Sequence, residues 1–494
     1  MSKFLYFILF CTVGFGVGYA QKIGFRCESQ IGVNGIDLLT GNVALKQGNT
    51  IVYCNKAELN RNSNTFVAYG NVHVVQNGTT DIYSELLNWD GNTEMGRFSD
   101  NVRLVDDGKT LFTPNLDFNS QTNSGYFYNG GKVVDKDATL TSKSGNYYPS
   151  EKFYIFRDKV VVTGTDYVLY SDTLRYYTQT SKAQVFGPTH IYGKDSAYCY
   201  TENGWYDTQT ELGQFNKNSF FRNNQQKMWG DTLVYERKNG IARGFKNVVL
   251  WDSIQNIFVK GNRMVYYKNP EHAIVTNKAQ FIQADKKDTM YLHADTLYTE
   301  YDSSGVYRIV KAYKRARIFR NDLQAKSDSI VYSMKDSVIH LYKLPIVWSE
   351  GNQVTADKIE VYTQNKRPYK MEMINSSFIS SKEDEIRFNQ IKGKNMTGYF
   401  KDNHLYLIIV NSNGETLYFA KDKEKLIGMN KAEGSKIKIY IKKNKPEKIL
   451  FFSKPIAVLH PIEKLKPEDI VLKDFKWFEH IRPKDKNDIF EWRE

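Results

Sequence analysis

The chain has 494 residues, with 68 Lys and Arg against 55 Asp and Glu and a formal net charge of +13. With 41% hydrophobic and 25% charged residues, its composition is that of neither a disordered chain nor an integral membrane protein. The 34 Tyr and 11 Pro favour strands over helices, and the positive charge is spread thinly along the chain, so we expect no nucleic-acid partner.

The N-terminus has the pattern of an export signal. Lys3 is followed by an apolar stretch over residues 4–17 and by Gly18-Tyr19-Ala20, a small-x-small end typical of a cleavable signal peptide. We therefore expect residues 1–20 to be a signal peptide and the mature chain to be periplasmic. Retention of this segment as a membrane anchor is the alternative, and association with the inner or outer membrane stays open.

Few cysteines remain beyond that segment. Cys27, Cys54 and Cys199 are too few for a disulfide framework, and their odd number leaves at least one thiol unpaired. A single Cys27–Cys54 bridge is left open. Stability must therefore come from a large core and from the hydrogen bonds of strand ladders.

A repeat of about thirty residues is the strongest pattern in the chain. It begins with a turn pair followed by Val, and looser copies continue to about Phe378. The clear copies are Gly41-Asn42-Val43, Gly70-Asn71-Val72, Asp100-Asn101-Val102, Gly131-Lys132-Val133, Asp158-Lys159-Val160 and Lys246-Asn247-Val248.

A second motif, Asp-x-Leu-x-Tyr, lies between these triplets. It is seen in full as Asp172 to Tyr176 and Asp231 to Tyr235, and with Ile for Leu as Asp328 to Tyr332. Around both motifs, apolar residues alternate with polar ones at the period of a strand, and Gly-Asn or Asp-Asn pairs permit positive φ. Each repeat therefore predicts two short strands and two turns, and stacked repeats share one continuous core.

The repeat predicts one long repetitive element rather than three globular domains. We expect about twelve units over residues 21–378, a degenerate lysine-rich continuation over 379–452, and an irregular C-terminal segment over 453–494 that caps the stack.

The sequence offers little evidence for chemistry. No His pair is spaced to bind a metal, no CxxC pair occurs, and no nucleotide loop or nucleophile elbow is found. We therefore expect no cofactor, no metal and no enzyme activity. Carboxylates such as Asp231 and Asp295 recur at the same phase of the repeat, which favours turn residues over a catalytic pair.

The triplet repeat, the second motif and the export signal together resemble the OstA-like branch of the lipopolysaccharide-transport family, which includes LptA and the N-terminal domain of LptD. The resemblance covers roughly residues 41–440 and is clearest over residues 41–162. It implies an all-β, elongated, repetitive twisted β-jellyroll with open sheet ends. This chain is far longer than LptA and lacks the C-terminal barrel of LptD, so its place in a transport bridge is not given by the resemblance.

The resemblance further implies a non-enzymatic role, in which an apolar groove shields lipid A acyl chains on their way to the outer membrane. The implied partners are lipopolysaccharide and other jellyroll transport proteins paired edge to edge, including an LptD-like outer-membrane partner. The alternating residues expected to line the groove are Val43, Leu45, Val72, Val74, Val102, Leu104, Val160, Val162, Leu174, Leu233, Val248, Leu250, Leu297 and Ile330.

Two alternatives stay open. One is an exported β-solenoid that binds or cleaves polysaccharide, with the interleaved Tyr and Trp as stacking platforms. The other is a structural scaffold at the cell surface.

Overall fold

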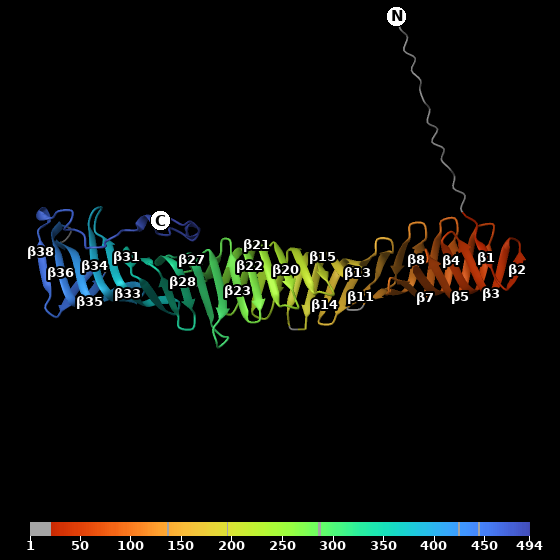
Figure 1. Cartoon of the computed structure of the whole chain (residues 1–494), viewed down its shortest axis with the longest axis horizontal. Helices are drawn as coiled ribbons and strands as arrows, with labels where there is room; N and C mark the ends of the chain where they lie inside the picture. The colour runs from red at the N-terminus through yellow and green to blue at the C-terminus, as the bar shows by residue number, and fades with distance from the viewer. Residues whose placement is uncertain (1–20, 136–137, 195, 285–287, 423–424, 443–444) are drawn as a thin grey trace, which may run out of the picture. The chain divides into compact units, whose positions relative to one another are not determined.

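A computed structural model of the chain describes residues 21–135, 138–194, 196–284, 288–422, 425–442 and 445–494. The predicted signal peptide over residues 1–20 lies outside this range. The described part consists of antiparallel strands and tight turns, with three short 3-10 helices near the C-terminus (Figure 1). The all-β prediction is therefore confirmed. No helix in these ranges is long and apolar enough to cross a membrane.

The chain divides into two compact units, which we describe separately. Unit 1 comprises residues 1–194 and 203–210, and unit 2 comprises residues 195–202 and 211–494. The strand β16 (Tyr198–Asp207) contributes residues to both. The thirty-residue repeat continues across this division, so the repeat does not indicate where one unit ends and the other begins.

Unit 1 contains fifteen complete strands. They are β1 (Gly24–Arg26), β2 (Ser29–Val33), β3 (Ile36–Gln47), β4 (Thr50–Asn60), β5 (Thr65–Gln76), β6 (Thr80–Asp90), β7 (Met95–Asp106), β8 (Lys109–Asn119), β9 (Ser124–Tyr128), β10 (Gly131–Val134), β11 (Ala138–Ser142), β12 (Ser144–Tyr148), β13 (Phe153–Gly164), β14 (Tyr167–Tyr177) and β15 (Lys182–Gly193).

Unit 2 continues the pattern. Its first strands are β17 (Leu212–Lys217), β18 (Phe220–Arg222), β19 (Gln226–Trp229), β20 (Thr232–Glu236), β21 (Ile241–Asp252), β22 (Ile257–Lys268), β23 (Glu271–Thr276), β24 (Gln280–Gln283), β25 (Met290–His293), β26 (Thr296–Tyr301), β27 (Arg308–Arg320) and β28 (Leu323–Ser333). The rest are β29 (Val338–Tyr342), β30 (Ile346–Ser349), β31 (Asn352–Thr355), β32 (Lys358–Gln364), β33 (Arg367–Lys382), β34 (Phe388–Lys401), β35 (His404–Asp422), β36 (Lys425–Lys442), β37 (Lys445–Phe452) and β38 (Ile456–His460), followed by the 3-10 helices η1 (Ile462–Lys464), η2 (Glu479–Ile481) and η3 (Asp488–Phe490).

Most long strands change direction at a corner near their middle. In β3 the corner is Gly41-Asn42, in β5 Gly70-Asn71 and in β7 Asp100-Asn101, and all six residues have positive φ between 44° and 74°. The pairing register shifts at each corner and resumes beyond it, as between Thr40 and Val43. Two consecutive left-handed residues turn the chain without ending the ladder, and Gly and Asn tolerate this conformation.

The triplets were expected to be turns between short strands, and the structure refines this expectation. In β3, β5 and β7 they are corners within one continuous strand. At Gly131-Lys132-Val133 the positive-φ pair is instead Asn129-Gly130, and β10 starts after it. The physical reason is that ladder hydrogen bonds satisfy the backbone on both sides of the corner, so no loop is needed.

Each unit therefore consists of two half-sheets joined along a row of corners, with an apolar interior between them. Burial alternates along the strands, as in β7, where Val102 and Leu104 point inward and Arg103 points outward. In unit 2 the inward side chains from Met228 to Ile439 form one continuous cluster. The side opposite the corners, where hairpin turns of the two half-sheets meet, is called the rim below.

The C-terminal segment, residues 461–494, runs back along strands of unit 2 (Figure 1). It follows β38, which pairs with β36 from Met429↔His460 to Glu433↔Ile456. The segment expected to be irregular thus starts with a strand, and the expected boundary at residues 378 and 379 falls inside β33.

Candidate functional site

The apolar interior is the candidate site, because it is the feature that the repeat builds again and again. All fourteen residues expected to line a groove point into it, and each is at most 4% exposed. Those of β21, Val248 and Leu250, flank the outward-facing Val249 on the same strand. The structure thus brings the fourteen residues into the interiors of the two units. Whether lipid contacts them stays a prediction.

In the structure, side chains fill this interior. Members of the unit 2 cluster such as Leu292 and Val347 are fully buried. A cavity near the C-terminal end, between Ile379, Ile408 and Ile439, has a volume of only about 30 Å³. This space is far smaller than an acyl chain, which fits into this cavity only if the half-sheets separate or side chains move.

Polar side chains bridge the rim of unit 1. Gln47, the last inward residue of β3, accepts from Trp89 Nε1 at 2.8 Å and donates to the carbonyl of Gly91 at 2.7 Å. One repeat later, Gln76 donates to the carbonyl of Ser120 at 3.4 Å. Each bond joins a turn of one half-sheet to a turn of the other, so together they hold the rim closed.

The next rim bridge uses charge. Asp106, the last inward residue of β7, accepts from Tyr147 and from Lys152 Nζ at 3.1 Å. Burial, the neighbouring Tyr154 and the hydrogen bond to Asp106 raise the pKa of Tyr147 far above its ordinary value, so it stays a donor. A further step along, Tyr176 donates to Asp135.

Unit 2 closes its rim with a buried ion cluster. Arg308, 2% exposed, contacts Asp252 Oδ2 at 3.1 Å and Glu271 Oε1 at 3.0 Å. Gln226 also donates to Glu271, at 2.5 Å. Although burial lowers the pKa of Arg308, the surrounding Tyr301, Glu271 and Asp252 raise it further, so the net shift is upward and the group stays charged.

The rim residues were missed from sequence, yet a signal for them exists. In β3, β5 and β7 two inward apolar residues are followed, two positions later, by Gln47, Gln76 and Asp106. A polar residue at the same inward phase of three repeats is expected only where it meets a partner, because an unpaired buried polar group is costly.

The recurrent aspartates lie outside the interior, at the corners. Asp231 accepts from Asn247 Nδ2 at 3.1 Å, and Asp295 accepts from Arg315 Nε at 2.9 Å. Asn247 and Arg315 are themselves corner residues with positive φ. The carboxylates therefore stabilise the corners of neighbouring strands, as the turn interpretation predicts.

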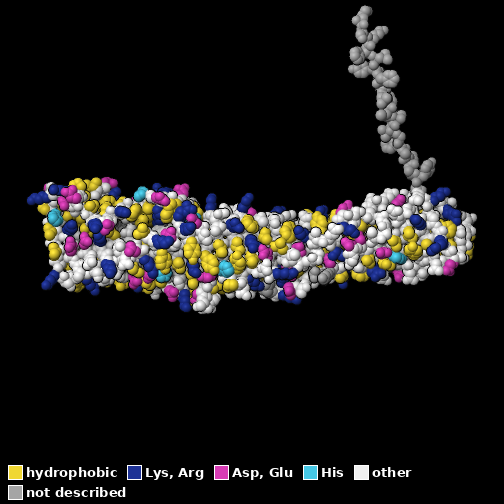
Figure 2. Space-filling view, in the orientation of Figure 1, with side chains coloured by type: hydrophobic (Ala, Val, Ile, Leu, Met, Phe, Trp, Pro, Cys, Tyr) yellow, Lys and Arg dark blue, Asp and Glu magenta, His cyan; other side chains and the backbone are white. Residues whose placement is uncertain are grey.

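Other reactive groups are dispersed. Cys27, Cys54 and Cys199 are free thiols, and burial raises the pKa of Cys54 to about 11. Within the described ranges, no three His, Cys, Asp or Glu side chains are placed to hold a metal ion. On the face shown in Figure 2, Lys and Arg are scattered among apolar and neutral side chains rather than gathered in one patch.

Among the described residues, the first and last strands of the ladder present open edges. In the described part, β2 has β3 as its strand neighbour, and its Ile31 and Val33 are exposed. Near the C-terminus, β38 pairs with β36, and its Ile456, Val458 and Leu459 are exposed. Open edges with exposed apolar residues can accept a further strand.

Comparison with known proteins agrees with this architecture. The sequence model of the family described as "OstA-like protein" matches residues 29–172 and 165–256. The model described as "LptA/(LptD N-terminal domain) LPS transport protein" matches residues 284–367. No curated protein matches the chain.

Among solved structures, one match is the crystal structure of LptH, the LptA-homologous periplasmic component of the lipopolysaccharide transport device from Pseudomonas aeruginosa. It is 13% identical and covers 34% of this chain and 82% of LptH, with a TM-score of 0.12. That score gives the superposition no weight, so the assignment rests on the family models and on the folded-over repeats. The chain belongs to the OstA-like family of lipopolysaccharide-transport proteins with the LptA and LptD N-terminal β-jellyroll.

Proposed function

We propose that this chain is a non-enzymatic periplasmic lipopolysaccharide-transport protein whose interior shields lipid A acyl chains during passage to the outer membrane. The observation that carries the proposal is the apolar interior, which each unit builds from inward side chains of successive repeats. Each buried CH₂ contributes about 0.8 kcal/mol, so a long apolar interior can hold several acyl chains without any single anchor residue.

Access to the interior is through the rim. The bridges of Gln47, Gln76 and Asp106 in unit 1 join the turns of the two half-sheets by side-chain hydrogen bonds rather than by a strand ladder. Neutral bonds of this kind contribute about 0.5–1.5 kcal/mol each, and bonds to a charged group such as Asp106 about 1.5–3 kcal/mol. Their cost is small beside the apolar burial of an acyl chain, so we infer that cargo separates the rim locally and that the bridges re-form behind it.

The partners follow from the open edges. A neighbouring jellyroll transport protein adds a strand to β2, and another, such as an LptD-like outer-membrane partner, adds one to β37 or β38. Edge pairing of this kind continues the ladder and joins the apolar interiors end to end. The export signal predicted over residues 1–20 supports a periplasmic location, either free or associated with a membrane.

The alternatives have less support. Glycan cleavage needs a pair of carboxylates facing a cleft, whereas Asp231 and Asp295 are paired with corner residues. The scaffold alternative gives the apolar residues that recur at the inward phase of each repeat no function beyond packing.

Photo-crosslinking in intact cells tests the proposal. A crosslinker replaces Val72, Leu104 or Val248, which point inward, and Val249 on β21 is the matched outward control. We expect lipopolysaccharide adducts at the inward positions and none at Val249. If the folded protein forms no such adduct at any inward position, or forms equal amounts at Val249, the conduit is ruled out.

A further inference from the structure

The outer face of the half-sheet beyond the corners is built alike in both units but covered in only one. In unit 1, five outward residues follow one another across β7, β8, β10, β11 and β13, and we call them the unit 1 ladder. They are Arg103, Phe112, Lys132, Thr141 and Val161.

The corresponding unit 2 ladder crosses β27, β28, β30, β31 and β33. It consists of Arg317, Lys326, Ile346, Thr355 and Phe378. The two sets correspond strand by strand, because β8 splits its pairing between β9 and β10 as β28 does between β29 and β30. Arg103 and Arg317 also occupy the same place, two residues after the positive-φ pair of their strand.

The C-terminal segment covers the unit 2 ladder. Trp492 lies over Lys326 Nζ at 4.0 Å and over the Arg317 guanidinium at 5.4 Å, and Lys326 donates to the carbonyl of Arg493. Ile481 packs against Ile346 and Trp348. Asp488 and the C-terminal Glu494 favour the charged forms of Arg317 and Lys326, although burial lowers the pKa of Arg317 to about 10.

Glutamine side chains hold the segment in an extended form. Gln353 donates to the carbonyl of Lys476 at 2.7 Å and accepts from the amide of Phe478 at 2.6 Å. Gln390 makes the same pair of bonds to Ile470 and Leu472, each at 2.8 Å. This face is therefore able to hold a peptide segment by paired backbone bonds and to place an aromatic ring over two cations.

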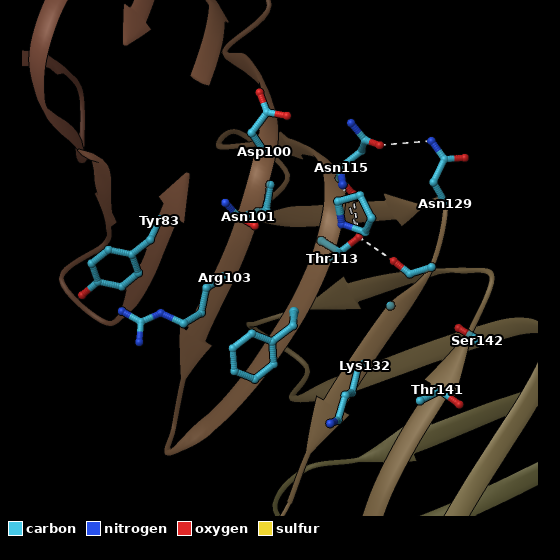
Figure 3. Close-up of a pocket in the computed structure, with 15 residues that line it drawn as sticks. Tyr83, Asp100, Asn101, Arg103, Thr113, Asn115, Asn129, Lys132, Thr141 and Ser142 are labelled. Carbon is cyan, nitrogen blue, oxygen red and sulfur yellow. Dashed lines mark hydrogen bonds between the residues drawn. The ribbon is translucent and has the colours of Figure 1, made fainter. Parts of the chain in front are cut away.

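The unit 1 ladder is open. Phe112 is 45% exposed, and Arg103 and Lys132 are exposed on either side of it. These residues line an open depression of about 970 Å³, with Asn115 and Asn129 joined by a hydrogen bond at its border (Figure 3). No carboxylate is ion-paired with Arg103 or Lys132 among the described residues.

The ring of Tyr83, which also lines the depression, is not free to stack on a sugar. His73 stacks on one face of the Tyr83 ring, at 4.4 Å and 6° between planes. The Arg103 guanidinium, from the neighbouring strand on the other side, lies 4.3 Å from the ring (Figure 3). A sugar needs a free ring face, which Tyr83 does not offer, whereas the exposed Arg103 and Lys132 outnumber Asp100, the one carboxylate among the residues that line the depression. Charge complementarity therefore points to an acidic ligand.

We propose that the unit 1 ladder is a docking site for an extended segment of a partner protein, bearing carboxylates and an aromatic residue. The partner's carboxylates pair with Arg103 and Lys132, and its ring packs on Phe112 and the Arg103 guanidinium. The aromatic part of this arrangement repeats the contact by which Trp492 covers Lys326 and Arg317 in unit 2.

The two sites differ in how tightly they hold a peptide. The strand register places Thr139 of unit 1 at the position that Gln353 has in unit 2. Thr139 has no side-chain amide, so it cannot make the pair of bonds that Gln353 makes to a peptide backbone. The partner is also a separate molecule, whereas the C-terminal segment is tethered to its site. Binding at unit 1 is therefore reversible and sensitive to salt.

A peptide with the sequence of residues 485–494 is the probe, because its chemistry fits such a ladder. The full chain carries a photo-crosslinker at Phe112, where only a peptide bound at unit 1 reacts. We expect a saturable adduct that falls at least tenfold in the Arg103→Glu, Lys132→Glu variant. The control is Arg97→Glu, on the same strand before the corner, and it should leave the adduct unchanged. An adduct that does not saturate, or that the double variant retains, overturns the proposal.

The same crosslinker at Phe112 in native cells identifies the occupant. A discrete adduct with another protein through an acidic, aromatic segment supports the proposal. An adduct with lipopolysaccharide, a glycan or a second copy of this chain overturns it, as does the absence of any adduct while variants at Leu104 still capture lipid. Failure here is thus distinguishable from failure of the lipid-transport proposal.

Discussion

The strands β10 and β30 occupy equivalent places in the two units, yet their burial differs. In β10, Lys132 and Val134 are exposed and alternate with buried residues, whereas all four residues of β30 are buried. The difference arises because the C-terminal segment covers the outer face of β30. The same half-sheet can therefore be a solvent-facing wall or the middle layer of a second core, depending on what lies against it.

The interiors of the units, by contrast, are alike. Leu104 in unit 1 and Leu292 in unit 2 are both fully buried between half-sheets. Apolar burial in the interior is thus common to both units, and the units differ in what covers their outer faces.

Removing residues 462–494 should have the largest effect. It exposes Trp348, Phe378, Leu417 and Phe419, which pack against the segment. Each large apolar side chain contributes about 1.5–3 kcal/mol when buried, so the free energy of unfolding of unit 2 should fall by at least about 5 kcal/mol. Hydrogen exchange measured peptide by peptide checks this, with β7 to β13 of unit 1 as the internal control. Equal protection of β30 from exchange with and without the segment would contradict the claim that the segment buries the outer face of β30.

The rims provide the second test. Arg308→Met leaves Asp252 buried without its cation, and breaking such a buried pair costs about 3–5 kcal/mol. The matched change in unit 1, Lys152→Met, should cost less, about 1.5–3 kcal/mol, because Asp106 keeps its bond from Tyr147 and Lys152 is partly solvated. Urea unfolding of the two variants measures the difference. Similar midpoints would mean that the ion cluster is not the main closure of the unit 2 rim.

Substitution of Gln353, which holds the backbone of the C-terminal segment, should release that segment. Gln353→Ala removes two bonds to the segment backbone, at a cost of about 1–3 kcal/mol. Thr139→Ala, at the equivalent place in unit 1, should change stability by less than about 0.5 kcal/mol. Limited proteolysis between Lys473 and Arg493 reports release. Cleavage as slow as in the unmodified chain would show that apolar packing alone holds the segment.

Acidification should loosen the segment slightly. The His293 ring contacts the Phe490 ring, with 4.7 Å between centroids and 54° between planes. Burial lowers the pKa of His293 below the ordinary value of 6.5; Arg317 and Arg315 act in the same direction, and the hydrogen bond to Ala279 and the charge of Asp295 oppose it. The unfolded state then binds more protons than the folded state, so the contribution is complete above pH 6.5 and is lost as the pH falls through the lowered pKa. Fluorescence of Trp492 followed from pH 7.5 to 5.0 should show this loss, and His293→Gln should remove it. A pH response that persists in that variant would assign it to another group.

Much of the fold was accessible from the sequence. The triplet repeat predicted strands, and its period predicted one stacked core. All fourteen residues chosen by inward phase are buried. The reason is that period-2 alternation and turn residues such as Gly41 and Asn42 act locally, within one or two repeats.

Other features escaped the sequence reasoning for an equally physical reason. The run Ile346-Val347-Trp348 already indicates a strand buried on both faces, since a one-sided strand would alternate. What covers its outer face could not be read, because the cover comes from residues more than a hundred positions later, as the bond between Lys326 and Arg493 shows.

The amino-acid sequence by itself determined the repeating strands, their corners and the inward phase of Val72, Leu104 and Val248, because these follow from local periodicity and backbone preference. Only the tertiary structure decided which faces are closed. Rim bridges such as that from Arg308 to Asp252, and the covering of Ile346 by Ile481, join residues that no local pattern relates. It is the folding of the sheet onto itself that brings these residues into contact.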